Sequence, residues 1–342
     1  MMKTFPLVTV ITVTFNCIAS KRERFLIENI NSVANQTYPN LEHLFIDGAS
    51  TDGTVEFLTS FVQSGFIRLI TERDNGIYDA MNKGHKLANG DYVLVLNSDD
   101  SYAYPGAIYD LMSSLMNNNA EYAYGDQICI RPDNSTFVDR FDLSAFWQRM
   151  PFNHPTLLIK KSIVQELGFY RTDLDTVADY KFVIDLILKD YKGVGVRKNI
   201  VNFRLGGASF DEKTLYSKYW ASYIKLPKVL SLLYLQFDPR MVEENIINGF
   251  MLETDGVYDD VFLDRLLIFM LNRKLKNYDY DSFISFVLKL KQRKAIAGNV
   301  IVQDVRYKFL GLTIFQKKLR KYGTRVKLFG FIPIACFFSK PF

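Results

Sequence analysis

Residues 90–100 read Gly-Asp-Tyr-Val-Leu-Val-Leu-Asn-Ser-Asp-Asp. Within them Tyr92–Leu96 is almost wholly apolar, as expected of a strand that is covered on both faces of a parallel sheet. The strand ends directly in four polar residues, of which Asp99 and Asp100 are carboxylates. In open α/β sheets, ligands bind beyond the carboxyl ends of the strands. The stretch therefore predicts a buried central strand with a polar site at its end.

Three strand–helix units precede this strand. Short β-branched or apolar runs predict their strands, at Leu7–Phe15, Leu41–Ile46 and Phe66–Ile70. Apolar residues at helical spacing predict a helix after each strand, at 25–34, 55–61 and 77–87. We therefore predict an α/β fold with a mixed, mainly parallel sheet covered by helices, which is a Rossmann-like nucleotide-binding domain.

The chain of 342 residues is long enough for one large domain and a smaller appendage. We assign residues 1–210 to the α/β domain. Residues 211–300 carry apolar residues at helical spacing and are predicted to form a C-terminal helical appendage. The sequence indicates no function for this appendage.

Residues 301–342 form a basic, aromatic-rich tail. They contain nine Lys or Arg and one acid, Asp304, whereas the whole chain has a net charge of only +5. Lys308–Phe315 is echoed by Lys327–Ile334, and apolar runs flanked by cations suit an anionic membrane surface. The alternative is that these runs pack on the appendage and leave their charges solvated. We predict a tail that binds the membrane surface.

Cysteine usage and hydropathy bear on the compartment. Cys17, Cys129 and Cys336 are far apart and lack CxxC spacing, which indicates a reducing compartment and no structural zinc. No uninterrupted apolar stretch approaches the roughly 20 residues that a membrane-spanning helix needs. The mild net charge does not indicate nucleic acid as a partner. We predict a cytoplasmic protein, peripheral at the inner face of the cell membrane.

Polar segments follow all four strands, and three of the segments carry acids. They are Thr14–Asn16, Asp47–Ser50, Glu72–Gly76 and Asn97–Asp100. Converging carboxylates repel one another unless a cation lies among them, and Mg²⁺ or Mn²⁺ is the simplest candidate. We predict Asp99 and Asp100 as the metal ligands because a strand holds them directly. The alternative is that Asn-Ser-Asp-Asp is only a turn that ends a buried strand.

The first two polar segments predict a nucleobase site. Asp47 precedes Gly48, so a flat base can approach the backbone and donate a ring N–H to the carboxylate. Phe15 and Asn16 would flank the same base.

The later segments predict contacts with ribose and phosphate. Asp74 lies before a helix that carries Asn82, and Ser98 belongs to the polar segment after the fourth strand. Lys83 and His85, on the same helix, are predicted to be solvated and not to be ligands.

Two residues in the second half are candidates for chemistry. Asp179 begins a helical pattern, where a carboxylate could take a proton from an attacking hydroxyl. An acid that merely interacts well with the helix dipole is the alternative. His154 lies at a loop-to-strand junction, where it could contact the acceptor or a phosphate, or be a satisfied structural histidine.

Five segments, taken in order and with their spacing, resemble family 2 of the inverting glycosyltransferases, which have the GT-A fold. They are Val8–Asn16, Asp47–Thr54, Glu72–Gly84, Gly90–Asp100 and Ala178–Tyr180, within a match over residues 7–210. The resemblance implies that the nucleoside is held by Thr14, Asn16, Asp47 and Asp74. It also implies that Asp99 and Asp100 form the metal motif and that Asp179 is the general base.

The reaction implied by this resemblance is the transfer of a sugar, with inversion, from a nucleoside diphosphate donor, a UDP-sugar being favoured. The acceptor would be a hydroxyl of a glycan or of a lipid-linked saccharide, because similar chain endings accompany bacterial surface-polysaccharide transferases. Asp179 would deprotonate that hydroxyl while the cation takes up charge on the departing diphosphate.

The chain departs from the commonest family pattern at three positions. Gly48 stands where a second acid is usual, which leaves base recognition to Asp47. Met81 stands where an Arg often precedes the Asn, which removes a phosphate contact. Asn97 replaces the first Asp of the metal motif, which weakens metal affinity or leaves the metal chiefly to Asp99.

Two other classes of protein are alternatives to this interpretation. A sugar nucleotidyltransferase would share the fold and the metal, but it usually carries a Gly-rich basic loop where this chain has Asn16-Cys-Ile-Ala19. A catalytically idle nucleotide- or glycan-binding protein at the membrane surface would have lost the carboxylates, which are all present.

Overall fold

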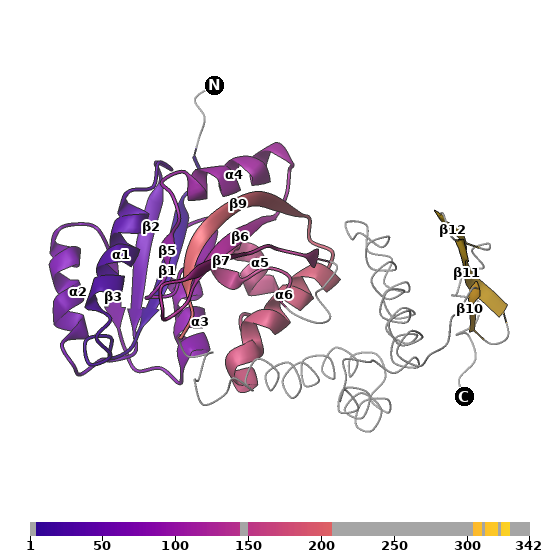
Figure 1. The fold of residues 1–342 in the computed structure, drawn as a ribbon. Coiled ribbons are helices and arrows are strands. Elements are labelled where there is room, and N and C mark those ends of the chain that lie inside the picture. The colour runs from indigo at the N-terminus through magenta and orange to yellow at the C-terminus, as the bar shows by residue number, and fades with distance from the viewer. Residues whose placement is uncertain (1–4, 144–149, 207–303, 310–311, 321–322, 329–342) are drawn as a thin grey trace, which may run out of the picture. The chain divides into compact units, whose positions relative to one another are not determined.

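The computed structural model describes residues 5–143, 150–206, 304–309, 312–320 and 323–328. The chain divides into two compact units, one of Met1–Glu243 with Leu275–Asp279 and the other of Glu244–Lys274 with Tyr280–Phe342. The first unit contains a nine-stranded mixed sheet with helices packed on it (Figure 1).

The first half of this unit follows the predicted alternation of strands and helices. The strands are β1 (Val8–Thr14), β2 (Leu41–Asp47), β3 (Arg68–Thr71), β4 (Tyr92–Val95) and β5 (Ser101–Tyr102). The helices are α1 (Glu23–Ala34), α2 (Thr54–Gln63), α3 (Ile77–Leu87) and α4 (Ala107–Asn117). The four strands and three helices predicted for residues 7–96 all form, with ends that differ by one or a few residues, whereas β5 and α4 were not predicted.

The second half adds strands that the sequence patterns did not predict. They are β6 (Tyr122–Ile130), β7 (Thr136–Asp139), β8 (Leu158–Lys160) and β9 (Gly193–Arg204). The helical elements are η2 (His154–Thr156), α5 (Lys161–Glu166), η3 (Thr172–Val177) and α6 (Ala178–Leu188).

The strand order is β3-β2-β1-β4-β8-β6-β9-β5, and β7 pairs with β6. β1 to β4 form a parallel block, as predicted. β8 runs antiparallel to both β4 and β6, whereas β6 and β9 are parallel. The sheet is therefore mixed, which confirms the predicted fold class.

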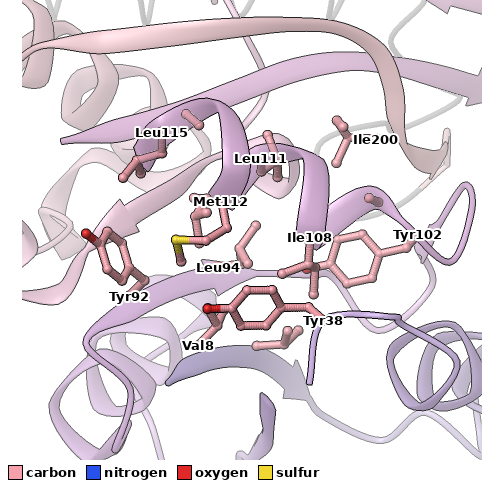
Figure 2. Packing of buried hydrophobic residues seen from close by; sticks show 14 of the residues in the cluster. Val8, Tyr38, Tyr92, Leu94, Tyr102, Ile108, Leu111, Met112, Leu115 and Ile200 are labelled. Atoms are coloured by element: carbon pink, nitrogen blue, oxygen red, sulfur yellow. The ribbon is translucent and has the colours of Figure 1, made fainter. Parts of the chain in front are cut away.

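Helices cover both faces of the parallel block. α4 lies over β4 and β9, where Ile108, Leu111 and Leu115 pack with Leu94 and other wholly buried side chains (Figure 2). α1 and α2 bury Leu26, Ile30 and Leu58 with Phe45. α3 covers the other face, where a Cβ on Gly84 would lie 2.3 Å from Cγ2 of Ile11. Only glycine allows so close a contact between helix and sheet.

The strand register brings the predicted polar segments to one edge. Thr14 pairs with Asp47, and Asp47 pairs with Thr71, so the last residues of β1, β2 and β3 lie side by side. Leu96, just past β4, donates its N–H to the carbonyl oxygen of Ile11 at 2.9 Å. The backbone pairing of the parallel block is therefore enough to bring the four polar segments close together.

The second unit is described by its strands. β10 (Asp304–Phe309), β11 (Leu312–Arg320) and β12 (Gly323–Leu328) form a three-stranded antiparallel sheet. The predicted helical appendage of residues 211–300 lies outside the described residues, and the domain boundaries stay predictions. Among the described residues, no helix has the length and apolarity needed to cross a membrane.

One sequence prediction about α3 was wrong. Lys83 keeps 19% of its side chain exposed and pairs with Glu72. His85, which was predicted to be solvated, is buried at 2% exposure, and its ring packs against Tyr170. The apolar neighbours across the helix, which decide burial, come from residues about 85 positions away in the sequence. Within the described residues, neither ring nitrogen of His85 has a hydrogen-bond partner.

Buried histidines make stability depend on pH. Burial lowers the pKa of His43 and of His85 to about 3. In the unfolded chain a histidine pKa is about 6.5, so below that pH the unfolded state binds more protons than the folded state. The free energy of unfolding therefore falls as the pH falls from about 6.5 to about 3, by roughly 1.4 kcal/mol per pH unit for each histidine.

Replacing His85 by phenylalanine is expected to remove one of these two contributions while keeping the ring contact with Tyr170. Urea unfolding at pH 7 and pH 5 measures the difference in the free energy of unfolding, which should be smaller by about 2 kcal/mol in His85→Phe than in the wild-type protein. The neutral-pH stability should rise, since an unpaired buried polar ring is lost. An unchanged difference between the two pH values would show that His85 is already protonated in the folded protein.

Candidate functional site

Asp47 is the centre of a hydrogen-bonded junction at the end of β2. Its side chain is wholly buried. Oδ1 accepts from the backbone N–H of Ser50 at 2.8 Å and from the hydroxyl of Thr71 at 3.0 Å. Oδ2 accepts from the hydroxyls of Thr14 at 3.0 Å and Ser50 at 2.6 Å. The carboxylate therefore links the ends of three strands, and each of its oxygens accepts two hydrogen bonds from within the protein.

Asn16 belongs to the same junction. It adopts a positive φ of 48°, its N–H donates to Ser50, and its side-chain oxygen accepts from the N–H of Thr51. Ser98 is buried nearby in the β4 loop. Thr14, Asn16 and Asp47 thus do meet, but they bond to one another and to neighbouring loops.

A second carboxylate, that of Asp74, and an exposed ring lie beside this junction. Phe15 is 63% exposed. A Cβ on Gly48 would lie 2.5 Å from Oδ2 of Asp74 and 3.2 Å from the ring of Phe15, so glycine leaves the space that these two groups occupy. Oδ1 of Asp74 accepts from the N–H of Gly76. The carboxylate of Asp74 therefore lies close to the place that a side chain at position 48, where the family usually has a second acid, would occupy.

Asn82 holds the second half of the unit against α3. Its amide nitrogen donates to the carbonyl oxygen of Tyr170 at 2.8 Å, and its amide oxygen accepts from the N–H of Tyr170 at 2.9 Å. Both ends of the amide are used in this bonding. In this structure the Asn82 amide links α3 to the backbone of Tyr170. The predicted contact of Asn82 with a nucleotide stays a prediction.

The two acids after β4 lie in different environments. Asp100 is wholly buried, and its carboxylate accepts from the backbone N–H of Arg204 at 2.8 Å and from the amide of Asn97 at 2.8 Å. Burial and the neighbouring charge of Asp99 raise its pKa well above the usual range. Asp99 keeps 15% of its side chain exposed and lies 3.3 Å from the guanidinium of Arg22.

A divalent cation would find one accessible carboxylate here. Asp99 faces the edge of the sheet, whereas both oxygens of Asp100 are already bonded. Within residues 5–143 and 150–206, no three His, Cys, Asp or Glu side chains gather closely enough to hold a metal ion. The donor set therefore fits a cation that takes one protein carboxylate and its other ligands from a diphosphate and water.

Asp179 lies at the same edge, at the start of α6. Its Oδ1 accepts from the hydroxyl of Tyr78 at 3.0 Å, and its Oδ2 lies 2.9 Å from Nδ1 of His154. Nε2 of His154 lies 3.2 Å from Oδ1 of Asn97. Burial and the charge of Asp179 raise the pKa of Tyr78, which therefore stays a neutral donor. A single chain of contacts thus links Asp179 to the loop that carries Asp99.

Comparison with known proteins identifies the family. The family model described as Glycosyl transferase family 2 matches residues 9–171. The PGL/p-HBAD biosynthesis glycosyltransferase of Mycobacterium bovis is 30% identical over 182 residues, which are 52% of this chain and 69% of that protein. The chain belongs to glycosyl transferase family 2. An uncharacterized glycosyltransferase of Haemophilus influenzae is 27% identical over 241 residues, 67% of this chain and 93% of that protein.

Solved structures share the fold of this family 2 glycosyltransferase. TarS 1–349 of S. aureus in complex with UDP has a TM-score of 0.52 at 15% identity, covering 94% of this chain and 98% of that chain. A mannosyltransferase from Pyrobaculum calidifontis in complex with GDP-Man and Mn²⁺ has a TM-score of 0.53 at 15% identity, covering 85% and 87%. The predicted GT-A fold is confirmed.

Several residues of this glycosyltransferase's site were missed by sequence reasoning. They are Arg22, Asn29, Tyr78 and Arg204. Asn29, on α1, donates to the carbonyl oxygens of Asn97 and Asp100, and Arg204, on β9, contacts both Asp99 and Asp100 through backbone or side chain. Each lies far from its partner in the sequence. Tyr78 lies inside the Glu72–Gly84 segment, which was a signal, whereas Arg22, Asn29 and Arg204 lie in no motif.

Proposed function

We propose that this family 2 glycosyltransferase transfers a sugar, with inversion, from a UDP-sugar to a hydroxyl of a glycan or lipid-linked saccharide in bacterial polysaccharide biosynthesis. The observation that carries the proposal is the placement of Asp179 and Asp99 at one sheet edge, joined through His154 and Asn97. An acid that can accept a proton and an acid that can bind a cation are the two groups that direct displacement requires.

The donor is proposed from structural relatives that share the fold. TarS was solved with UDP and with UDP-GlcNAc, and the archaeal mannosyltransferase was solved with GDP-Man and Mn²⁺. The exposed ring of Phe15 and the carboxylate of Asp74 offer a stacking face and a hydrogen-bond acceptor beside the Asp47 junction. Uracil and guanine both have the ring N–H that such an acceptor recognises. The junction then shapes this site, and Asp47 acts by positioning.

In the proposed reaction the acceptor oxygen forms a bond to the anomeric carbon as the bond to the diphosphate oxygen breaks. Asp179 takes the hydroxyl proton, and attack from the face opposite the leaving group inverts the configuration. A Mn²⁺ or Mg²⁺ ion at Asp99 would neutralise charge that develops on the nucleoside diphosphate. Because a sugar hydroxyl is a poor acid, the orientation of Asp179 matters as much as its basicity.

The proposed setting is the inner face of the cell membrane, with residues 301–342 on the anionic surface and a lipid-linked acceptor within reach. The net positive charge of that segment supports this setting. This part of the proposal rests on the sequence.

Nucleotide binding tests the function most directly. At a concentration of 100 times Kd, a ligand stabilises the folded state by about 2.7 kcal/mol, so UDP with Mn²⁺ should raise the melting temperature by several degrees. GDP, dTDP and Mg²⁺ serve as comparisons. Asp99→Ala should lose the Mn²⁺-dependent part of the shift, whereas Asp133→Ala, at the exposed β6–β7 turn, should keep it. The absence of a shift with every nucleotide would overturn the proposal.

A further inference from the structure

We propose that Asn29, on α1, is the positioning residue for the loop that carries Asp99, and that the affinity of this loop for a divalent cation depends on it. The inference rests on the proposed function, in which Asp99 binds Mn²⁺ or Mg²⁺ together with a nucleoside diphosphate. The bonds of Asn29 to the loop are made to its backbone, so the residue would act on Asp99 through the shape of the loop.

The loop after β4 contains a tight turn. The N–H of Asp100 donates to the carbonyl oxygen of Asn97 at 3.0 Å, which closes a β-turn with Ser98 and Asp99 at its two central positions. The direction in which each side chain leaves the backbone depends on the geometry of this turn. Asp99 keeps 15% of its side chain exposed, whereas Asp100 is wholly buried. The turn therefore separates an accessible acid from a buried one.

A single buried amide holds both ends of this turn. Nδ2 of Asn29 donates to the carbonyl oxygen of Asn97 at 2.9 Å and to that of Asp100 at 3.1 Å. An amide nitrogen carries two hydrogens, so these two bonds use both of them. Backbone carbonyl oxygens can only accept, so the amide nitrogen must face them whatever the ionisation of the neighbouring acids. The direction of both bonds is therefore fixed by the backbone.

Asn29 is a polar residue at a position that favours an apolar one. Its side chain is wholly buried in the middle of α1, where asparagine is a weaker helix former than leucine. Its remaining polar atom, Oδ1, lies 3.5 Å from the hydroxyl of Thr12, on β1. Burial of a polar side chain costs free energy that only its hydrogen bonds recover. The two bonds to the turn are therefore the main return for placing an asparagine here.

The turn is the first of several places at which α1 holds the chain after β4. Asn29, Ser32 and Gln36 are spaced three and four residues apart, so they lie on one face of the helix. Ser32 accepts from the backbone of β5 at 3.1 Å. Gln36 donates to the carbonyl oxygen of Tyr104 and accepts from the N–H of Ile108, both at 3.0 Å. This polar stripe follows the backbone from the turn to α4.

Gln36 provides the matched control for Asn29. Each side chain bonds to two backbone groups of the segment after β4, so loss of either should lower stability. The bonds of Gln36 lie past β5, whereas those of Asn29 lie at the turn itself. A purely structural role would therefore give the two variants the same binding properties. A positioning role predicts that only the Asn29 variant loses cation binding.

Titration of UDP into the full chain, with and without Mn²⁺, measures this without any turnover. An ion that binds together with UDP lowers the Kd for UDP, and Asp99→Ala marks complete loss of this gain. Asn29→Leu keeps the branched shape but has no donor. It should lose most of the gain, because loss of a group that orients a metal ligand weakens metal affinity about 10- to 100-fold. Gln36→Met should keep the gain, and both variants should bind UDP alone as the wild-type protein does.

Hydrogen exchange of residues 97–102 in the full chain without ligand tests the bonds to the turn directly. The N–H of Asp100 closes the turn, so its exchange should be faster in Asn29→Leu than in Gln36→Met. If Asn29→Leu does not fold, Asn29→Ser takes its place, since it keeps one donor on a shorter side chain. That variant should show smaller changes in the same direction.

Two results would overturn the inference. One is a full Mn²⁺-dependent gain in a folded Asn29 variant, and the other is an equal loss of the gain in Gln36→Met. Failure of the proposed function gives a different result, since the wild-type protein would then bind no nucleotide. If the wild-type protein binds UDP with Mn²⁺ and the Asn29 variants do so equally well, the transferase proposal stands and the role of Asn29 is wrong.

Discussion

Replacing Asp179 by asparagine should lower kcat about 10³-fold, which is within the usual range for loss of a general base. The substitution keeps the size of the side chain and leaves an oxygen that can still accept from Tyr78, whose hydroxyl lies 3.0 Å from Oδ1. An amide has no basicity at neutral pH, so proton transfer from the acceptor hydroxyl is lost. The Kd for UDP should change less than twofold, since Asp179 contacts no group assigned to the nucleotide.

The measurement is release of the nucleoside diphosphate during transfer, together with titration of UDP against each variant. Asp173→Asn is the matched control, because Asp173 lies six residues earlier at the surface, in an ion pair with the exposed Arg171. That control should keep full turnover. A loss of UDP affinity in Asp179→Asn that matches the loss of kcat would contradict the role of a base and assign Asp179 to donor binding.

Replacing Asp47 by alanine should lower the free energy of unfolding by about 4 kcal/mol, because four donors at a wholly buried carboxylate lose their acceptor. The donors come from the ends of β1 and β3 and from the loop after β2, so the edge of the sheet should loosen as well. We expect the melting temperature to fall by roughly 10 °C and UDP binding to weaken with it.

Asp52→Ala provides the comparison, because Asp52 lies five residues away and also accepts several hydrogen bonds. Its carboxylate accepts from the N–H of Ala19 and from the N–H and hydroxyl of Thr54, but at an exposed loop that starts α2. Water can replace that acceptor, so the cost should be about 1 kcal/mol, as for loss of a helix cap. Equal costs for the two variants would show that burial of Asp47 adds nothing.

The parallel half of the fold was predictable because its signals are local. A run such as Tyr92–Leu96 has the composition of a doubly covered strand, and each helix shows its own apolar spacing. The strands β6 and β8 were missed because their pairings with each other, with β4 and with β9 join segments that are far apart in the sequence. Their pairing depends on which surfaces remain uncovered after the parallel block has formed.

The location of the candidate site could be predicted from the sequence better than the roles of its individual residues. Asp47, Asp74, Asp99 and Asp179 do lie around one edge of the first unit. Asp47 was predicted to bind the base, and the structure shows it bonded to four internal donors. Asp100 was predicted as a metal ligand, and its environment is a wholly buried contact with β9. Both functional assignments stay predictions, and the bonding favours Asp74 and Asp99 for the accessible roles.

The sequence by itself determined that strands alternate with helices and that acids follow the strands, because side-chain periodicity and turn chemistry act over a few residues. Only the tertiary structure decided which of those acids face solvent. A carboxylate can accept few hydrogen bonds, and whether internal donors use them depends on residues brought from far away, such as Thr71 for Asp47 and Arg204 for Asp100. His154 shows the same dependence, since its two ring nitrogens contact Asp179 and Asn97, which lie 25 and 57 positions away in the sequence.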